Sequence, residues 1–283
     1  MRFVLVFLFA FLIAAPTVSA ADNLKLEGSF TQGGMATGRV APGSNVRFLD
    51  RDVRVSKEGL FVIGFGRDFL NKAELEITSP DGKMTRRLVD IKKRTYKIQR
   101  ISGLPKKMVS PGKKALERIR RENVWIGKVR SRNTETPWFS AGFIWPAIGP
   151  VSGVYGSQRI LNGKPRRPHF GVDVAMPTGT PVVAPAAGMI ALAKKDLYFT
   201  GGTIMIDHGH GLTSVLMHLS RLEVSTGDVV RAGDDIGAIG ATGRATGPHL
   251  DWRINWFNQR LDPQLLVPPM PKASTAKAKD KKN

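Results

Sequence analysis

The chain has 283 residues, a length that allows one large or two modest domains, and its hydrophobic fraction of 42% excludes a wholly disordered protein. It has no cysteine, which excludes a disulfide framework and leaves His, Asp and Glu as the available metal ligands. The formal net charge of +20 favours polyanionic partners.

The N-terminus has the pattern of a secretory signal peptide. Arg2 supplies a positive charge, residues 3–15 form an uninterrupted apolar run, and Val18-Ser19-Ala20 precedes the expected cleavage position. A membrane anchor is the alternative, but the run is shorter than the roughly 20 residues that span a bilayer. We therefore predict a signal peptide over 1–20 and an exported protein of the periplasm or cell envelope, soluble after cleavage. In that location the basic charge favours anionic wall polymers or lipid head groups as partners, and not nucleic acid.

Residues 23–97 have the pattern of short strands separated by turns. The sequence Ser79-Pro80-Asp81-Gly82 is typical of a tight turn and predicts a hairpin. Regularly spaced short strands are typical of a β-sandwich, so we expect a small β-sandwich-like module that positions the protein or contacts substrate. The strands are expected at 45–49, 59–65, 73–78 and 84–89.

Residues 98–136 are predicted to form a basic linker with a helix. Ser110-Pro111 is typical of a helix start with Pro at the first helical position, and residues 113–130 are rich in Lys and Arg. The helix either presents a solvated charged face, which is the simpler interpretation, or attaches the protein to the wall electrostatically.

Residues 137–267 are rich in Val, Ile, Gly and turn residues, with almost no helical period, and this pattern predicts a second β-domain. The predicted fold class is therefore mainly β. Residues 268–283 are rich in Pro, Ala and Lys without an apolar period, and we expect a disordered basic tail.

All five histidines lie between residues 169 and 249, which points to chemistry in the second domain. In an extended segment, residues four apart face the same side, so His169 and Asp173 can hold one ion between them. Likewise, His249 and Asp251 share one face of a strand while the residue between them points to the core.

The other histidines are less informative from their local sequence. His218 ends an apolar strand, where a histidine is more often structural. His208 and His210 alternate with glycines, and we interpret both as turn residues and not as metal ligands.

Residues 150–267 resemble the M23 family of zinc endopeptidases, the lysostaphin/LytM type. Each matching motif is weak alone, but their order and spacing together are specific. The matching residues are His169-Phe170-Gly171-Val172-Asp173, Gly179-Thr180-Pro181-Val182, Ala186-Ala187-Gly188, Ile206-Asp207-His208-Gly209, His218-Leu219-Ser220, Gly227-Asp228-Val229-Val230, Gly233-Asp234, Gly240-Ala241-Thr242-Gly243 and Gly247-Pro248-His249-Leu250.

The resemblance implies an antiparallel β-sheet groove with one Zn²⁺ ion per chain on its floor. It implies that His169 and Asp173 are metal ligands, and that His218 and His249 are catalytic residues acting on the water and the developing oxyanion. The two catalytic roles are not divided between these histidines. The family's third ligand is the second His of a His-x-His motif, and Asp251 occupies that position here. Because a carboxylate oxygen also binds zinc, we expect Asp251 to be the third ligand.

The implied function is an exported metal-dependent endopeptidase that hydrolyses peptide bonds in peptidoglycan during cell-wall remodelling or turnover. The alternative is a catalytically impaired LytM-like regulator that binds and activates cell-wall amidases, with Asp251 as a step on that route. A biotinyl- or lipoyl-carrier-like module, suggested by the turns Gly227-Asp228 and Gly233-Asp234, is disfavoured because no Lys occupies an apolar hairpin tip.

Overall fold

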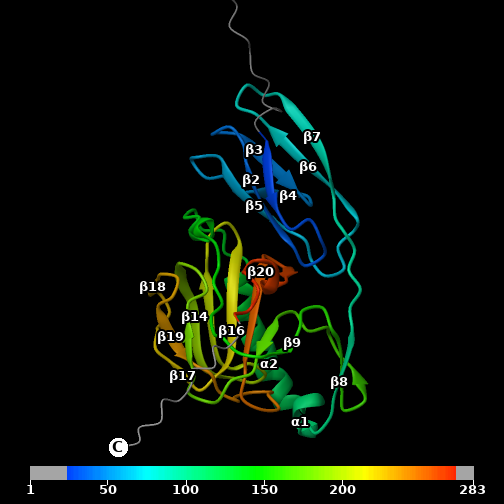
Figure 1. Cartoon of the computed structure of the whole chain (residues 1–283), viewed down its shortest axis with the longest axis vertical. Coiled ribbons are helices and arrows are strands. Elements are labelled where there is room, and N and C mark those ends of the chain that lie inside the picture. The colour runs from blue at the N-terminus through cyan, green and yellow to red at the C-terminus, as the bar shows by residue number, and fades with distance from the viewer. Residues whose placement is uncertain (1–23, 272–283) are drawn as a thin grey trace, which may run out of the picture.

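The computed structural model describes residues 24–271, which form two β-rich parts, one stacked on the end of the other (Figure 1). The mainly β fold class predicted from the sequence is confirmed. The signal peptide predicted over 1–20 lies outside the described residues, as do residues 272–283 of the predicted tail. None of the helices within 24–271 combines the length and the hydropathy that a membrane span requires.

The N-terminal part packs the buried faces of two small antiparallel sheets into one core. Their strand orders are β1-β2-β5 and β4-β3-β6-β7. Alternation explains the arrangement: along β6, Ala73, Leu75 and Ile77 point inward while their neighbours are more exposed. The predicted turn joins β6 to β7, with Gly82 at φ 84°. The strands are β1 (Lys25–Gly28), β2 (Met35–Arg39), β3 (Asn45–Phe48), β4 (Arg51–Val53), β5 (Leu60–Gly64), β6 (Lys72–Thr78) and β7 (Met84–Asp90).

The C-terminal part is built on an antiparallel sheet in the order β18-β14-β15-β16-β20-β12-β9, with β21 paired to β20. A smaller sheet has the order β13-β19-β17, and another has the order β11-β10-β8. The strands are β8 (Ile98–Ile101), β9 (Val151–Gly153), β10 (Gln158–Leu161), β11 (Lys164–Pro165), β12 (Val172–Val174), β13 (Pro181–Val183), β14 (Gly188–Leu197), β15 (Gly201–Asp207), β16 (Leu212–Leu219), β17 (Arg221–Leu222), β18 (Val229–Val230), β19 (Asp235–Ala238), β20 (Leu250–Trp256) and β21 (Gln259–Leu261). Two 3-10 helices, η2 (Trp138–Ala141) and η3 (Pro263–Leu265), flank this part.

Every residue of the central strands β15 and β16 is buried, because both faces of the sheet are covered. On one face, Met205 and Met217 pack with Val129 of helix α2 (Lys113–Arg130). Their strand neighbours Ile204 and Leu216 point the other way, into the main core.

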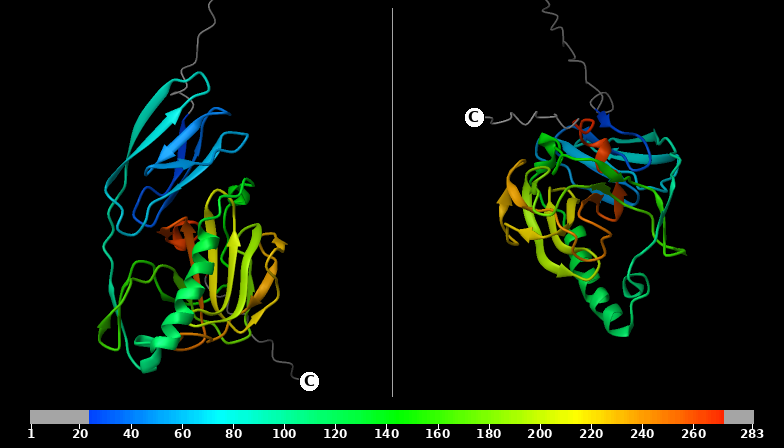
Figure 2. Two further views of the ribbon diagram at one scale, coloured as in Figure 1. Left: turned by 180° about the vertical axis from the view of Figure 1, so that it is seen from behind. Right: turned by 60° about the horizontal axis from the view of Figure 1, so that its bottom comes forward.

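Residues 91–112, which follow β7, run along the side of the C-terminal part to its far end (Figures 1 and 2). From there the chain returns as α2. There β8 pairs in parallel with β10, and α1 (Lys106–Val109) precedes α2. The basic stretch 113–130, which was predicted to be helical, coincides with α2. The helix does not begin at Ser110-Pro111, however, so that predicted start signal is wrong. Ser110 instead ends α1, where its N–H donates to the Lys106 carbonyl, and Gly112 is the N-cap of α2.

The two parts are joined by a packed interface. Phe48 of β3 lies 6.0 Å from Trp256 of β20, measured between ring centroids. Gly64 lies so close to β20 that a Cβ there would be 2.8 Å from the Cβ of Trp256. Beside it, Arg94 Nη1 lies 2.8 Å from Oδ2 of the buried Asp262. The N-terminal part is therefore held against the end of the strand that carries Asp251.

Candidate metal and catalytic site

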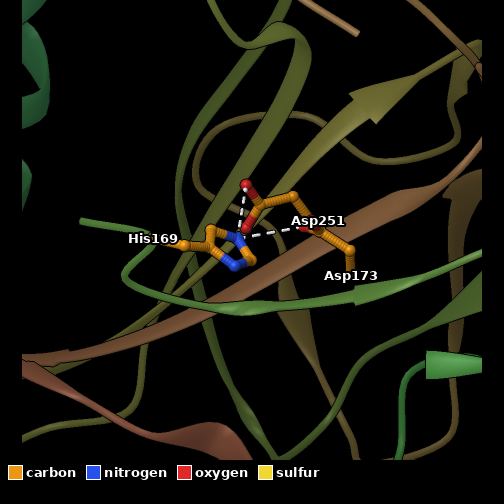
Figure 3. Close-up of side chains that lie close together, drawn as sticks. All are labelled: His169, Asp173 and Asp251. Carbon is orange, nitrogen blue, oxygen red and sulfur yellow. Dashed lines mark ion pairs between the residues drawn. The ribbon is translucent and has the colours of Figure 1, made fainter. Parts of the chain in front are cut away.

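Two adjacent strands bring the three predicted metal ligands together. Asp173 of β12 and Asp251 of β20 are direct partners across the antiparallel pair, and His169 lies in the loop before β12. His169 Nε2 is 3.0 Å from Asp173 Oδ1 and 3.4 Å from Asp251 Oδ2 (Figure 3). One ligand atom from each residue lies within 4.8 Å of the others, and all three side chains are buried.

The donor atoms of this cluster fit a divalent cation. His169 Nδ1 is 3.3 Å from the Val154 carbonyl oxygen, and donation to it leaves the Nε2 lone pair directed at the carboxylates. His169 Nε2 and Asp173 Oδ1, which lie 3.0 Å apart, are both buried and have no hydrogen-bond partner outside the cluster. Because unpaired buried polar atoms are costly, two that converge on one point indicate a missing partner. An imidazole nitrogen with carboxylate oxygens suits zinc and also harder divalent ions.

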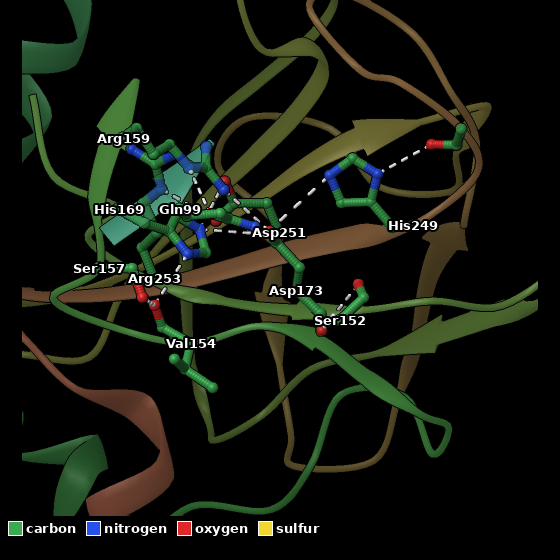
Figure 4. A network of polar contacts seen from close by, with 11 residues as sticks. Gln99, Ser152, Val154, Ser157, Arg159, His169, Asp173, His249, Asp251 and Arg253 are labelled. Carbon is green, nitrogen blue, oxygen red and sulfur yellow. Dashed lines mark hydrogen bonds and ion pairs between the residues drawn. The ribbon is translucent and has the colours of Figure 1, made fainter. Parts of the chain in front are cut away.

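Each carboxylate of the cluster is also held by an arginine (Figure 4). Arg159 Nη2 donates to Asp173 Oδ2 at 2.9 Å and leaves Oδ1 of that residue free. Arg253 donates to both oxygens of Asp251, from Nε at 2.9 Å and from Nη2 at 2.6 Å. Each Asp251 oxygen accepts one of these bonds and keeps a further lone pair for a ligand.

Electrostatics keep Asp251 ionised despite its environment. Burial alone raises the pKa of its carboxyl group, but Arg253 and His169 outweigh burial and hold that pKa well below its usual range. Burial likewise lowers the pKa of His169, yet the attraction of Asp251 and Asp173 dominates and raises it. The carboxylate of Asp251 therefore stays ionised beside the His169 ring, as a metal ligand must be.

The two predicted catalytic histidines lie side by side next to this cluster. His218 is in β16 and His249 precedes β20, and their ring centroids are 4.7 Å apart. Each Nδ1 donates to a carbonyl oxygen, from His218 to Thr242 at 2.8 Å and from His249 to Gly247 at 2.9 Å. Both Nε2 atoms therefore keep a lone pair, and that of His249 is 4.0 Å from Asp173 Oδ1.

The imidazole ring of His218 stays uncharged at neutral pH. Burial, with a smaller contribution from His249, lowers its pKa to about 4, although Asp251 raises it. Its backbone has φ 65°, a left-handed conformation that is uncommon for a residue other than glycine. Such local strain concentrates at functional sites.

His208 and His210, predicted to be turn residues, lie in the loop between β15 and β16 and are both buried. His208 contacts the Ala187 carbonyl oxygen at 2.6 Å and Ser214 Oγ at 2.8 Å. His210 Nε2 is 2.9 Å from the Glu135 carbonyl oxygen. This loop is at the opposite end of β16 from His218, so the structure does not bring these histidines into the cluster.

A groove of about 300 Å³ opens onto the cluster. It is lined by Asp173, His218 and His249, by Ile101 at the end of β8 and Leu104 after it, and by the loop 244–248. A larger cavity of about 610 Å³ lies between the N-terminal part and β21, and it contains none of the ligand or histidine residues described above.

The arginines of the site were not predicted from the sequence. The role of Arg253 could have been predicted, because residues two apart in a strand share a face and Arg253 follows Asp251 by two. Arg159 lies in a different strand, and no local pattern links it to Asp173.

Residues 167–263 match the sequence profile of Peptidase family M23. This region is an M23 peptidase domain. The resemblance seen in the sequence is thereby confirmed. A crystal structure of a Pseudomonas aeruginosa protein assigned to peptidase M23 is similar with a TM-score of 0.66 and 28% identity, and the match covers 84% of this chain and 94% of that one. That likeness therefore extends beyond the M23 domain into the N-terminal part.

Curated relatives match a shorter part of the chain. The DD-carboxypeptidase/endopeptidase Mpg of Neisseria meningitidis is 40% identical over 111 residues, which are 39% of this chain and 25% of that protein. The peptidoglycan DD-endopeptidase ShyA of Vibrio cholerae is 40% identical over 87 residues, which are 31% of this chain and 20% of that protein. The match thus spans a quarter or less of the length of these two relatives.

Proposed function

We propose that this protein is a metal-dependent endopeptidase that hydrolyses peptide bonds in peptidoglycan. The M23 domain and its similarity to peptidoglycan DD-endopeptidases support the reaction and the substrate class. The observation that carries the proposal is the convergence of three buried ligand atoms, one each from His169, Asp173 and Asp251, beside a pair of histidines with free Nε2 lone pairs.

His169, Asp173 and Asp251 would hold the ion. A bound divalent ion lowers the pKa of a ligated water and polarises the scissile carbonyl group. His218, kept neutral by burial, is able to accept a proton at Nε2 at neutral pH. His249 presents a second Nε2 next to it, which suits proton transfer or hydrogen bonding to an oxyanion. The two histidines act as a pair, and the geometry does not divide the roles between them.

Arg159 and Arg253 position the ligands in this mechanism. Each fixes the orientation of one carboxylate through charge-assisted hydrogen bonds, which are stronger than bonds between neutral groups. Both guanidinium groups also counter the charge of the two carboxylates. Asp251 thereby replaces a neutral histidine ligand without adding an uncompensated negative charge.

The amidase-activator alternative is not favoured. A domain that only binds a partner has no chemical need for a converging set of ligand atoms with two adjacent histidines. Export to the envelope stays a prediction, as does attraction of the basic helix α2 to anionic wall polymers or lipid head groups.

The decisive experiment is digestion of purified peptidoglycan by the full chain lacking the predicted signal peptide, with zinc or manganese added. New peptide termini should appear and be identified by mass spectrometry. They should be absent when a chelator is present and with the Asp173→Ala variant. Unaltered peptidoglycan with the metal-loaded protein would contradict the proposal, and stimulation of an added amidase under the same conditions would support the regulator instead.

A further inference from the structure

Arg244 lies in the loop between β19 and β20 and lines the groove together with His218 and His249. Its backbone is fixed, because its N–H donates to the Phe199 carbonyl oxygen at 2.8 Å. The preceding Gly243 has φ 71°, and a Cβ there would lie 2.5 Å from the Gly201 nitrogen. Only glycine fits this position, so the loop presents Arg244 to the groove from a defined place.

The guanidinium group of Arg244 stacks on an aromatic ring but has no carboxylate partner among the described residues. It stacks over the Phe199 ring at 4.3 Å, and Nη1 donates to the Met108 carbonyl oxygen at 3.3 Å. No carboxylate among residues 24–271 forms an ion pair with it, whereas Arg159 and Arg253 each have one. Arg244 is only partly buried, and most of its N–H donors have no partner among residues 24–271, so they are free to bind a ligand.

Arg244 stays charged in this environment. Burial, with smaller contributions from the nearby Arg159, Arg253 and Arg166, lowers its pKa to about 10, so the group remains protonated at neutral pH. Two arginines, Arg159 and Arg244, line the groove, and of these only Arg159 forms an ion pair with a carboxylate, so Arg244 leaves the groove attractive to an anion.

We infer that Arg244 binds a free carboxylate of the peptide that enters the groove, and so makes the site selective for acidic peptides. A planar guanidinium matches a carboxylate in a two-point contact. The inference rests on the proposed function, because the peptide stems of peptidoglycan carry free carboxylates in addition to the peptide bonds. Ile101 and Leu104 line the same groove and suit the apolar parts of such a peptide.

A purely structural role for Arg244 makes a different prediction. Its bond to the Met108 carbonyl oxygen would then serve to hold α1. Arg166 provides the matched control, because it donates to the adjacent Val109 carbonyl oxygen at 2.9 Å but does not line the groove. Loss of either contact should disturb α1 to a similar degree.

The test compares soluble cross-linked muropeptides in which each free carboxyl group is amidated in turn. With the metal-loaded full chain, one of these amidations should lower kcat/KM by roughly tenfold to a hundredfold. Arg244→Gln should abolish that discrimination by weakening cleavage of the acid form only. Arg244→Lys, which keeps the charge but not the two-point contact, should retain part of it. Arg166→Gln should discriminate as the unaltered chain does.

Calorimetric binding of the same muropeptides to the metal-free chain separates this inference from the proposed function. A preference for one free carboxyl group that Arg244→Gln removes supports the binding site even if nothing is cleaved, in which case the proposed function alone fails. The inference is overturned if Arg244→Gln weakens acid and amide forms equally, if Arg166→Gln has the same effect, or if the unaltered chain shows no preference.

Discussion

Asp251 and Arg253 lie on one face of β20 and are joined by two hydrogen bonds of 2.9 Å and 2.6 Å. Asp251 is 1% exposed, and the Arg253 side chain is 26% exposed, so the pair is largely removed from water. The position usually held by a ligand histidine in this family thus contains half of an ion pair. We therefore expect that removal of either partner changes both metal binding and stability.

Asp251→Ala should remove the third ligand. We expect weak or absent metal binding, because only His169 and Asp173 would remain to hold the ion. Zinc and manganese content after dialysis measures the effect directly. Asp196→Ala is the control, since this exposed carboxylate is also paired with an arginine but lies outside the cluster. Full metal content in Asp251→Ala would show that Asp251 is not a ligand.

His218→Asn should lower hydrolysis by on the order of 10² to 10⁴ while leaving metal content nearly unchanged. Asparagine is chosen over alanine because His218 has φ 65°, a conformation that asparagine tolerates better. His210→Asn is the matched control, since His210 is also buried and has φ 50° but lies outside the site. A loss of metal in His218→Asn alone would place His218 among the ligands.

His249→Ala should give the same loss of hydrolysis with metal retained. Its ring contacts His218, and its Nε2 is 4.0 Å from Asp173 Oδ1, too far for a direct hydrogen bond. If the paired histidines act as one unit, the double variant should be little slower than either single variant. Multiplicative losses, measured as kcat/KM, would indicate independent roles.

The folded state should become less stable as the pH falls, because the buried His208 ring resists protonation. Burial lowers its pKa to about 4 from an ordinary value of 6.5, so the folded state prefers the neutral ring. Between these values the unfolded chain binds the extra proton. The contribution is therefore complete above pH 6.5 and is lost as the pH falls toward 4, at up to about 1.4 kcal/mol per pH unit.

Urea unfolding of the metal-free chain at a series of pH values measures this slope. His208→Gln keeps a neutral polar side chain at the position and should flatten the profile between pH 6.5 and 4. Nuclear magnetic resonance should show that the His208 ring does not titrate above pH 5. A ring that titrates near 6.5 in the folded protein would contradict the assignment.

The sequence predicted those parts of the fold that depend on neighbouring residues. Alternation along residues 73–78 and the turn at 79–82 predicted β6 and the hairpin to β7, because strand period and turn chemistry depend on neighbouring residues. The predicted ligand and catalytic residues followed from the family resemblance; the structure brings the five side chains together, and their roles stay a prediction.

Contacts between residues far apart in the sequence could not be predicted from local patterns. The parallel pairing of β8 with β10 joins residues 98 and 158, and no local signal specifies it. The ion pair of Arg159 with Asp173 depends on that same region, and the packing of Phe48 on Trp256 joins the two parts. These contacts depend on which surfaces meet when the chain folds, and so they required the structure.

Asp251→His restores the usual ligand of the family, but we expect this single change to harm the protein. Arg253 would lose the carboxylate that accepts its two hydrogen bonds and would remain as a largely buried cation beside the metal site. An unpartnered buried group of this kind costs about 1–3 kcal/mol, and the positive charge would also oppose a bound cation. We therefore expect lower unfolding stability and weak zinc binding in Asp251→His.

Exchange of both partners should reverse this loss. In Asp251→His/Arg253→Gln the new ligand is neutral, and the unpaired guanidinium group of Arg253 is absent. The unfolding stability and the zinc content should therefore return toward those of the unaltered chain. Arg253→Gln alone is the control, and it should leave Asp251 in place but less well oriented. The measurements are the free energy of unfolding and the zinc affinity of all four proteins. Coupling between the two sites is the expected result, because residues in one hydrogen-bonded pair do not behave additively. If the effects of the two substitutions simply add, Arg253 is not the group that adapts this site to an aspartate ligand.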